Sequence, residues 1–507
     1  MEKSNVVRET REKLMKDPYR PAYHFVLPED IVLGPADPNG AFFADGLYHL
    51  MYLYRNVGTD RHQWGHMVSH DLLHWWHRPD CLSYTNGDGS SFSGGAFVDE
   101  DKTAYLSYWK LPNPEIPGDF GGIAISYAKP PYDSWKQMKQ LADVSTVQGI
   151  RDAMIDGKVI HLGSADPSNI WKIGDKYYMQ YGNKPVLDEY GTGEHADPFY
   201  QGGWTELYRS EDLKNWEFVH RFYDVEPNGV DDWPDHTEDD MCPSFLPLYD
   251  AETNGNLTGK WLQLFIAHNK GCQYFVGTLK EEKFYPEVHG RMSWRDITYF
   301  APEALIDDKN RHIVWAWLKD NPEDDLERFG WSGVYALPRT VWWEDEVLHM
   351  APAKEVDSLQ YNHQELEIRP DGTIPVKNGT RCRIKGVWDG TKADKVGIRV
   401  GASKDGTEYT EIYLDVQRNK LVVDTTNSGI EGKNKGVEEA PFTLHAGENL
   451  ELDIFVDRSV VEVFANRRQA VSRRIVPSKD AGGVWLIGDA DAVCSLDSWE
   501  MAATNPY

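Results

Sequence analysis

Cysteine is scarce and scattered in this sequence of 507 residues. The five cysteines are odd in number and far apart, and none of them forms a C-x-x-C pair. They are Cys81, Cys242, Cys272, Cys382 and Cys494. Such a set predicts neither a disulfide framework nor a thiolate zinc site, so we expect buried free thiols. We expect no metal and no other cofactor.

Positively charged residues are also fewer than negatively charged ones. Lys and Arg total 53 against 81 Asp and Glu, which gives a formal net charge of −28. This excess opposes binding to nucleic acid or to an anionic membrane surface and suits a neutral small-molecule substrate better. No apolar run approaches the roughly 20 residues that span a bilayer, and the charged N-terminus lacks the apolar core of a signal peptide. We therefore expect a cytoplasmic protein, or a secreted one if the chain is truncated, and the oligomeric state stays open.

The composition favours strands. Aromatic residues make up 12% of the chain, and 43 Gly and 28 Pro supply many turns but little long helix. The length exceeds what one hydrophobic core serves, so at least two domains are expected. An all-β protein is the leading fold class.

A repeated pattern defines the first domain. A polar turn followed by an alternating, aromatic strand occurs five times, with starts roughly 50 to 85 residues apart. The copies lie at residues 45–54, 101–109, 174–182, 259–268 and 308–317. A shorter echo, S-x-D-L-x-x-W, begins at Ser69 and again at Ser210 and would open the outer part of a blade. Together they predict a five-bladed β-propeller over residues 21–350, after an N-terminal extension of residues 1–20.

After about residue 350 the strands lie closer together and the turns become tight. Ile412, Leu414 and Val416 alternate with polar residues, the chain turns at Arg418-Asn419, and the alternation resumes. This pattern is typical of a hairpin with one buried face. We expect two packed antiparallel sheets, a β-sandwich, over residues 351–507.

Polar residues precede the repeated turns at a fixed distance. Asp37, Ser93 and Asp166 each stand eight residues before the turn of their blade. The fourth blade carries the acidic stretch Glu238-Asp239-Asp240 further upstream of its turn. Because the innermost strand of every blade lines the central channel, carboxylates from three blades are expected to meet at one end of it.

These segments carry a family resemblance. The D-P-N-G at residues 37–40, the W-G-H at 64–66, the F-S-G at 92–94 and the D-P at 166–167 resemble motifs of glycoside hydrolase family 32, the β-fructofuranosidase group that includes invertases, inulinases and levanases. The resemblance runs over nearly the whole chain. It implies a five-bladed catalytic domain with an accessory β-sandwich, and a retaining, exo-acting hydrolase that releases terminal β-fructofuranosyl units from sucrose or short fructans, with possible transfer to another sugar.

The hydrolysis needs one ionised carboxylate as nucleophile and one protonated group to release the leaving oxygen. The resemblance implies that Asp37 is the nucleophile and that Asp166 stabilises the transition state. We predict Glu238 as acid/base, because crowding by Asp239 and Asp240 would raise its pKa; Asp240 is the alternative. The predicted substrate-binding residues are Asn39, Trp64, Phe92 and Ser93, with the two aromatic rings as walls for a sugar.

Four positions depart from the family. Ala36, Leu53 and Ala165 stand where an Asn, a Gln and an Arg normally touch the sugar, and Met241 stands where the acid/base Glu normally precedes the Cys. Two alternatives therefore stay open. One is a carbohydrate-binding protein that has lost turnover, and the other is a hydrolase for a related furanoside or an unusual fructosyl linkage.

Histidines recur every four residues as His62, His66, His70 and His74. On a helix they would share one face and suggest a metal site. The Trp and Val positions between them indicate a blade strand instead, so no metal is expected here.

Overall fold

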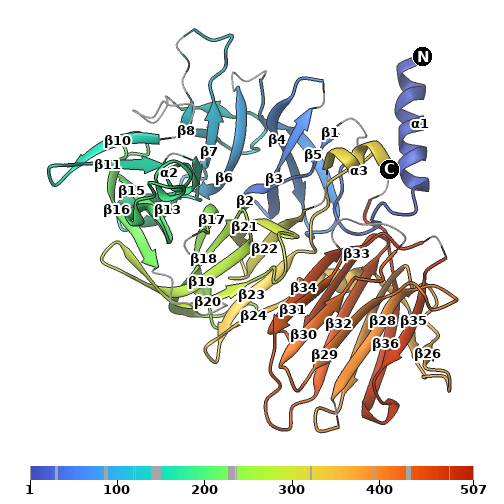
Figure 1. Ribbon diagram of the computed structural model, residues 1–507. Coiled ribbons are helices and arrows are strands. Elements are labelled where there is room, and N and C mark those ends of the chain that lie inside the picture. Colours follow the sequence, from blue (N-terminus) through green and yellow to red (C-terminus); the bar gives the residue numbers. More distant parts are fainter. Residues whose placement is uncertain are drawn as a thin grey trace. The chain divides into compact units, whose positions relative to one another are not determined.

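Antiparallel strands dominate the computed structural model of the chain. The structure describes residues 2–28, 32–56, 58–84, 89–117, 119, 121–138, 150–163, 165–225, 235, 237–319, 322–392, 394–429, 435–478 and 480–505. Five sheets follow one another along residues 32–352 and a pair of six-stranded sheets follows them, which Figure 1 shows in chain order from blue to red. The fold is a β-propeller followed by a β-sandwich, as the sequence predicted.

The blades share a simple up-and-down order. The first sheet has the order β1-β3-β4-β5 with β2 paired to β3, the third has β12-β14-β15-β16 with β13 paired to β14, and the other three follow the chain as β6 to β9, β17 to β20 and β21 to β24. β10 and β11 form a separate hairpin. The strands are β1 (Val32–Leu33), β2 (Pro38–Ala44), β3 (Leu47–Asn56), β4 (Arg61–Ser69), β5 (Trp75–Leu82), β6 (Ser90–Val98), β7 (Ala104–Leu111), β8 (Gly122–Ala128), β9 (Lys136–Gln137), β10 (Ile150–Ile155), β11 (Lys158–Gly163), β12 (Ala165–Pro167), β13 (Trp171–Ile173), β14 (Lys176–Gly182), β15 (Gly203–Ser210), β16 (Glu217–Val225), β17 (Met241–Tyr249), β18 (Leu257–Ala267), β19 (Gly271–Lys280), β20 (Lys283–Arg291), β21 (Tyr299–Ile306), β22 (His312–Leu318), β23 (Arg339–Glu344) and β24 (Val347–Pro352).

Four of the five repeated turns predicted from the sequence lie in connections between consecutive strands of a blade. The prediction was wrong for Gly259-Lys260, which lies within β18 because that strand begins at Leu257. In the first blade Ala44 pairs with Leu47, so Asp45 and Gly46 form a two-residue loop. Both have positive φ, 50° and 77°, which is the geometry of a type I′ turn and the reason for an Asp-Gly pair here.

The S-x-D-L-x-x-W echo folds into the same turn in two blades. The Asp71 carboxylate accepts the backbone N–H groups of Leu73 and His74, and the Trp75 indole donates to the Leu72 carbonyl at 3.1 Å. Asp212 and Trp216 make the corresponding bonds in the third blade. As predicted, each copy leads into an outer strand, β5 or β16.

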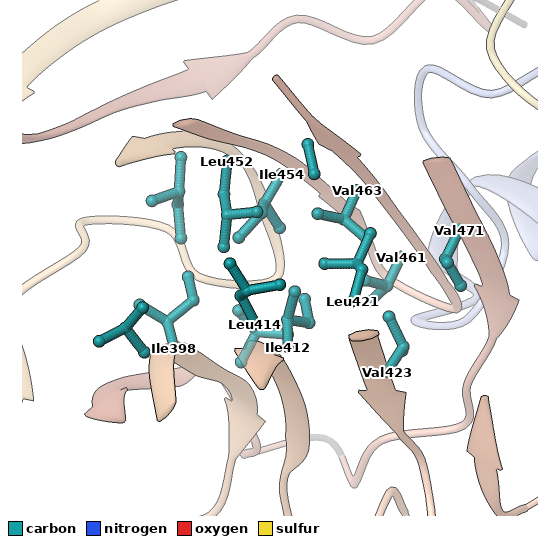
Figure 2. Packing of buried hydrophobic residues seen from close by; sticks show 14 of the residues in the cluster. Ile398, Ile412, Leu414, Leu421, Val423, Leu452, Ile454, Val461, Val463 and Val471 are labelled. Atoms are coloured by element: carbon teal, nitrogen blue, oxygen red, sulfur yellow. The ribbon is translucent and has the colours of Figure 1, made fainter. Parts of the chain in front are cut away.

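The sandwich core comes from the alternating residues. Ile412, Leu414, Leu421 and Val423 are buried and pack against residues of the opposite sheet such as Ile454, as Figure 2 shows. One sheet has the order β25-β36-β27-β32-β33-β34 and the other β26-β35-β28-β29-β30-β31. The strands are β25 (Gln360–Glu365), β26 (Thr373–Ile374), β27 (Arg381–Trp388), β28 (Lys395–Ala402), β29 (Thr410–Asp415), β30 (Lys420–Asp424), β31 (Val437–Pro441), β32 (Leu450–Asp457), β33 (Val460–Ala465), β34 (Gln469–Arg474), β35 (Gly483–Ile487) and β36 (Val493–Met501).

Helices are few. They are α1 (Glu2–Lys16), α2 (Lys184–Val186), α3 (Pro322–Phe329), a π-helical turn (Leu187–Gly191) and three 3₁₀ turns (Pro198–Tyr200, Lys354–Leu359 and Ala490–Ala492). In the described part of the chain, each helix is too short or too polar to cross a membrane. Four of the five free cysteines are buried, as expected. The expectation was wrong for Cys494, which is exposed because its position on β36 alternates away from the sandwich core.

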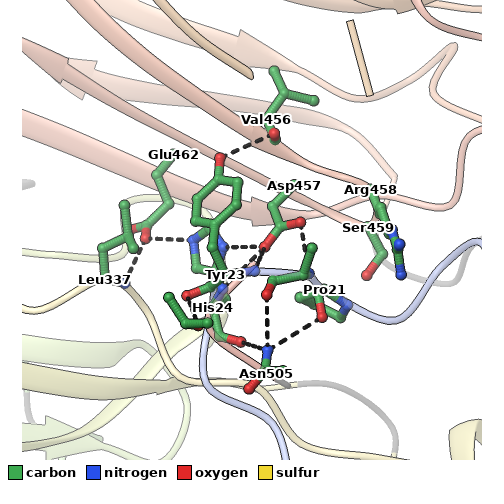
Figure 3. A network of polar contacts seen from close by, with 12 residues as sticks. Pro21, Tyr23, His24, Leu337, Val456, Asp457, Arg458, Ser459, Glu462 and Asn505 are labelled. Atoms are coloured by element: carbon green, nitrogen blue, oxygen red, sulfur yellow. Dashed lines mark hydrogen bonds and ion pairs between the residues drawn. The ribbon is translucent and has the colours of Figure 1, made fainter. Parts of the chain in front are cut away.

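The chain packs as two compact units whose limits differ from the predicted domains. Unit 1 comprises Met1–Ile31, Ser293–Tyr299 and Leu318–Tyr507, and unit 2 comprises Val32–Met292 and Phe300–Trp317. The N-terminal segment belongs with the sandwich because Asp457 accepts the backbone N–H groups of Ala22, Tyr23 and His24 (Figure 3). The spacing of strands and turns along the sequence did not indicate this contact, which joins residues more than 400 positions apart.

Candidate active site

Four strands in or next to the predicted site segments have an irregular register. The strand ladders shift register between Asn39 and Phe42, between Ser91 and Gly94, between Ala165 and Pro167, and between Met241 and Ser244. Such bulges re-aim side chains and are common next to active sites. They lie in β2, β6, β12 and β17, so four blades each present an irregular inner strand.

Asp37 is held by its backbone and leaves its carboxylate partly exposed. Its carbonyl accepts the N–H of Leu53 at 2.9 Å and the side-chain amide of Asn39 at 2.8 Å. The Ser93 hydroxyl donates to Asp37 Oδ2. The first blade thus holds the Asp37 backbone, and the second blade contacts its carboxylate.

Asn39 and Ser93 both donate hydrogen bonds to Asp37 in the structure. Asn39 is buried, and its Oδ1 accepts the N–H of Gly94 at 3.0 Å, which ties β2 to β6. Gly94 leaves no room for a side chain, because a Cβ there would lie 1.9 Å from the Ser107 carbonyl oxygen. Their prediction as sugar-binding residues is not tested by these contacts and stays a prediction.

Asp166 lies beside Asp37 with a residue that the sequence analysis did not select. Asp166 Oδ2 accepts the N–H of Cys242 at 3.3 Å and its thiol at 3.4 Å, and the same sulfur lies 3.9 Å from Asp37 Oδ2. Burial and the negative charges of Asp166 and Asp37 raise the pKa of Cys242 well above its ordinary value, so the thiol stays protonated and can donate. The position of Cys242 directly before Pro243, at the start of an inner strand, was the available signal.

Two environmental effects set the charge of Asp166. Burial and the neighbouring Asp37 carboxylate raise the pKa of Asp166 to about 6, against smaller lowering effects of His268 and the Cys242 hydrogen bonds. Its backbone is left-handed, with φ of 41°, because it is the extra residue of the bulge in β12. The charge of Asp166 therefore changes with pH near 6.

Glu238 lies outside this group of contacts. Its fully buried carboxylate accepts bonds from Lys270 at 2.6 Å, from Arg291 at 3.0 Å and from Gln273 at 2.7 Å. These three partners engage both carboxylate oxygens of Glu238. Glu238 as acid/base thus stays a prediction that this geometry disfavours.

Asp240 turns toward the third blade. Its Oδ2 accepts the Tyr223 hydroxyl at 2.7 Å, and its N–H donates to Asn183 at 2.8 Å. Burial raises the pKa of Asp240 well above its ordinary value, and the charges of Asp239 and Glu238 add to the effect. Within the described part of the chain, neither of these bonds reaches Asp37 or Asp166.

Asp239 instead holds a histidine. Its two oxygens accept the backbone N–H of His268 at 2.8 Å and bond the imidazole Nδ1 at 2.6 Å. Asp239 is buried, whereas 42% of the His268 side chain is exposed. His268 follows β18 directly and acts electrostatically on Asp166.

The predicted aromatic walls differ in exposure. Trp64 is fully buried among blade-core residues, and its indole donates to the Phe92 carbonyl at 3.1 Å. Phe92 is partly exposed and packs against Trp109 and His62, with ring centroids 4.9 Å apart in both pairs. Phe92 and Trp109 are thus partly exposed rings, whereas Trp64 lies in the blade core, and sugar binding by Trp64 and Phe92 stays a prediction.

The histidine series lies on a strand and not on a helix. His62 and His66 belong to β4, and the His66 Nε2 lies 2.9 Å from Nδ1 of His49. Burial lowers the pKa values of His49, to about 3, and of His66. Among the described residues, no group of three or more His, Cys, Asp or Glu side chains is placed to hold a metal ion.

Comparisons with known proteins place the chain in context. Residues 34–352 match the model described as "Glycosyl hydrolases family 32 N-terminal domain", and residues 352–500 match "Glycosyl hydrolases family 32 C terminal". A fructan 6-exohydrolase from Beta vulgaris is 25% identical, with 96% of this chain and 87% of the relative covered. A sucrose-6-phosphate hydrolase from Zymomonas mobilis is 27% identical, with 92% and 90% covered. The crystal structure of fructan 1-exohydrolase IIa from Cichorium intybus has the same fold, with a TM-score of 0.77, 20% identity, and 96% and 98% of the two chains covered.

Proposed function

This chain belongs to the glycosyl hydrolases of family 32, and we propose that it releases terminal β-fructofuranosyl units from sucrose or short fructans as a retaining, exo-acting hydrolase. The observation that carries the proposal is the pair of carboxylates Asp37 and Asp166, joined through the Cys242 thiol. Relatives named for fructan and sucrose-phosphate hydrolysis support the glycone. Transfer of the fructosyl unit to another sugar follows from the same intermediate when that sugar outcompetes water.

The two carboxylates suit different steps. Asp37 is partly exposed and accepts a hydrogen bond from Ser93, so it can attack the anomeric carbon as an anion and form a covalent fructosyl ester. Asp166 is buried beside it and can accept bonds from sugar hydroxyls. Above a pH of about 6 its negative charge stabilises the positive charge that develops on the sugar ring.

A second function is a carbohydrate-binding protein without turnover. Two observations favour it. Apolar residues stand at Ala36, Leu53 and Ala165, and Glu238 forms ion pairs with Lys270 and Arg291. Such a protein would bind the same sugars through Phe92 and Trp109 and release no product.

One experiment separates the two functions. Release of free fructose from sucrose, 1-kestose, inulin and levan is measured, with an aryl arabinofuranoside as the control glycone. We expect fructose from at least one of the short substrates, and loss of that activity in Asp37→Asn with an unchanged circular dichroism spectrum. Binding of these sugars by the parent protein without release of any fructose would establish the second function and contradict the first.

A further inference from the structure

The site described above lacks an evident proton donor. Met241 is buried, and its sulfur would lie 2.4 Å from a Cβ at Gly182, so it packs between blades. Glu238 is paired with two cations, and Asp240 is bonded to Tyr223. Hydrolysis of an alkyl glycoside such as sucrose nevertheless requires protonation of the leaving oxygen.

We propose that His268, oriented by Asp239, is the general acid and base of this enzyme, an inference that rests on the proposed hydrolase function. Asp239 fixes the ring through Nδ1 at 2.6 Å and the main chain through the N–H at 2.8 Å. The bond at Nδ1 directs the second ring nitrogen, Nε2, away from Asp239. Within the described residues, Nε2 has no hydrogen-bond partner, so it is available to a ligand.

The strand register places this pair at the end of the site. Met241 pairs with Ile266 across β17 and β18, and continuing that register two residues outward puts Asp239 opposite His268. Cys242, which bonds Asp166 and approaches Asp37, lies at the same end of β17. The His268 ring also packs against Phe300 in a T-shaped arrangement, with 5.8 Å between the ring centroids.

The charges around His268 favour the protonated ring. Burial lowers its pKa, but the hydrogen bond and charge of Asp239 and the charge of Asp166 raise it above the ordinary histidine value. The Lys184 ammonium opposes this effect without reversing it. The raised pKa extends the pH range in which the His268 imidazole is protonated upward, and Asp166 ionises above a pH of about 6.

The steps balance with this assignment. The His268 Nε2–H gives its proton to the glycosidic oxygen while the carbon–oxygen bond breaks and an Asp37 oxygen bonds the anomeric carbon. The neutral imidazole then takes a proton from water as that water attacks the anomeric carbon and releases the Asp37 carboxylate. His268 ends protonated, and fructose leaves.

The test compares two leaving groups. An aryl β-fructofuranoside with an acidic phenol needs little protonation, whereas sucrose needs it fully. We expect His268→Ala and His268→Gln to lose about 10²- to 10⁴-fold in kcat/KM on sucrose but less than about tenfold on the aryl substrate, with azide restoring part of the turnover. Asp239→Asn should move the basic limb of the pH profile to lower pH, because it removes the charge that keeps His268 protonated.

Matched variants provide the controls. His74 forms an exposed pair with Asp71 at 2.7 Å, so His74→Ala removes a similar His–Asp bond elsewhere and should leave both rates unchanged. Glu238→Gln should change kcat/KM by the same factor on sucrose and on the aryl substrate. Equal losses on both substrates in both His268 variants, or a leaving-group split in Glu238→Gln alone, would overturn the assignment. A parent protein that releases no fructose from either substrate would reject the proposed function and this role with it.

Discussion

At the scale of single residues, the environment of each carboxylate decides its role. Asp166, Glu238 and Asp240 are all buried, yet the first faces Asp37, the second faces Lys270 and Arg291, and the third faces Tyr223. Crowding in the sequence suggested that Glu238 would hold a proton. The two cations lie 32 and 53 residues further along the chain, so the acidic run itself did not reveal them.

Asp166→Asn tests the raised pKa at the site. The folded-state pKa is about 6, above the ordinary value of 3.8, so the ionised form is disfavoured by folding and the protein gains stability as the pH falls toward 4. The amide removes this buried charge. We expect kcat to fall by at least 10²-fold while the melting temperature at pH 7.5 stays equal or rises. Unchanged kcat, or a large fall in melting temperature, would contradict this account of Asp166.

At the scale of strands, the turns were predictable and the bulges were not. The Asp45-Gly46 turn and the two S-x-D-L-x-x-W turns depend on local hydrogen bonds and positive φ values, which residue type indicates directly. The bulges in β6 and β12 depend on how a strand pairs with its neighbour, and this pairing leaves little mark on composition. The Asp239–His268 bond was missed for the same reason, since it joins residues 29 apart through the β17–β18 pairing.

Gly94→Ala tests the bulge that holds Ser93. A Cβ at Gly94 would press against the Ser107 carbonyl and push β6 from β7, which displaces the Ser93 hydroxyl from Asp37. We expect kcat/KM on sucrose to fall roughly tenfold or more. Gly174→Ala is the control, because its φ is 61° but no atom lies within 4 Å of the new Cβ. It should cost about 1 kcal/mol of stability and leave activity unchanged. Equal effects of the two variants on activity would contradict the account.

At the scale of the whole chain, distant segments are joined by buried charge. His24 bonds Asp457 at 2.9 Å and Glu462 at 3.1 Å, and Arg339 also reaches Glu462 at 3.1 Å; Figure 3 shows His24 between the two carboxylates. The propeller and the sandwich could be predicted from the sequence, because alternation and turn spacing are local. The return of residues 22–24 to β32 and β33 could not, because nothing local encodes a partner more than 400 residues away.

This network predicts how stability depends on pH. Burial lowers the pKa of His24, but bonds to Asp457 and Glu462 raise it to about 9, so its contribution is complete below pH 6.5 and is lost as the pH rises to about 9. Despite burial, the His24 bond and the Arg339 charge lower the pKa of Glu462 to about 2, so its contribution is lost as the pH falls from 4.5 to about 2.

Urea unfolding across this range checks the prediction. His24→Gln should lose about 3 kcal/mol at pH 6, because it removes the cation between Asp457 and Glu462, of which Glu462 keeps Arg339. The decline in stability that the parent shows between pH 6.5 and 9 should then be absent. His363 pairs with Asp497 on the surface of the same unit, so His363→Gln should change stability by less than about 1 kcal/mol. A parent protein whose stability rises from pH 6.5 to 9 would refute a charged His24.

The central claim is that this enzyme cleaves fructosides by two displacements at Asp37. The measurement that tests it most directly is an NMR time course of sucrose hydrolysis that records the anomeric configuration of the first fructose released, before mutarotation. Two displacements predict β-fructofuranose as the first product. If α-fructofuranose forms first, a water molecule has attacked in a single step and Asp37 is not the nucleophile.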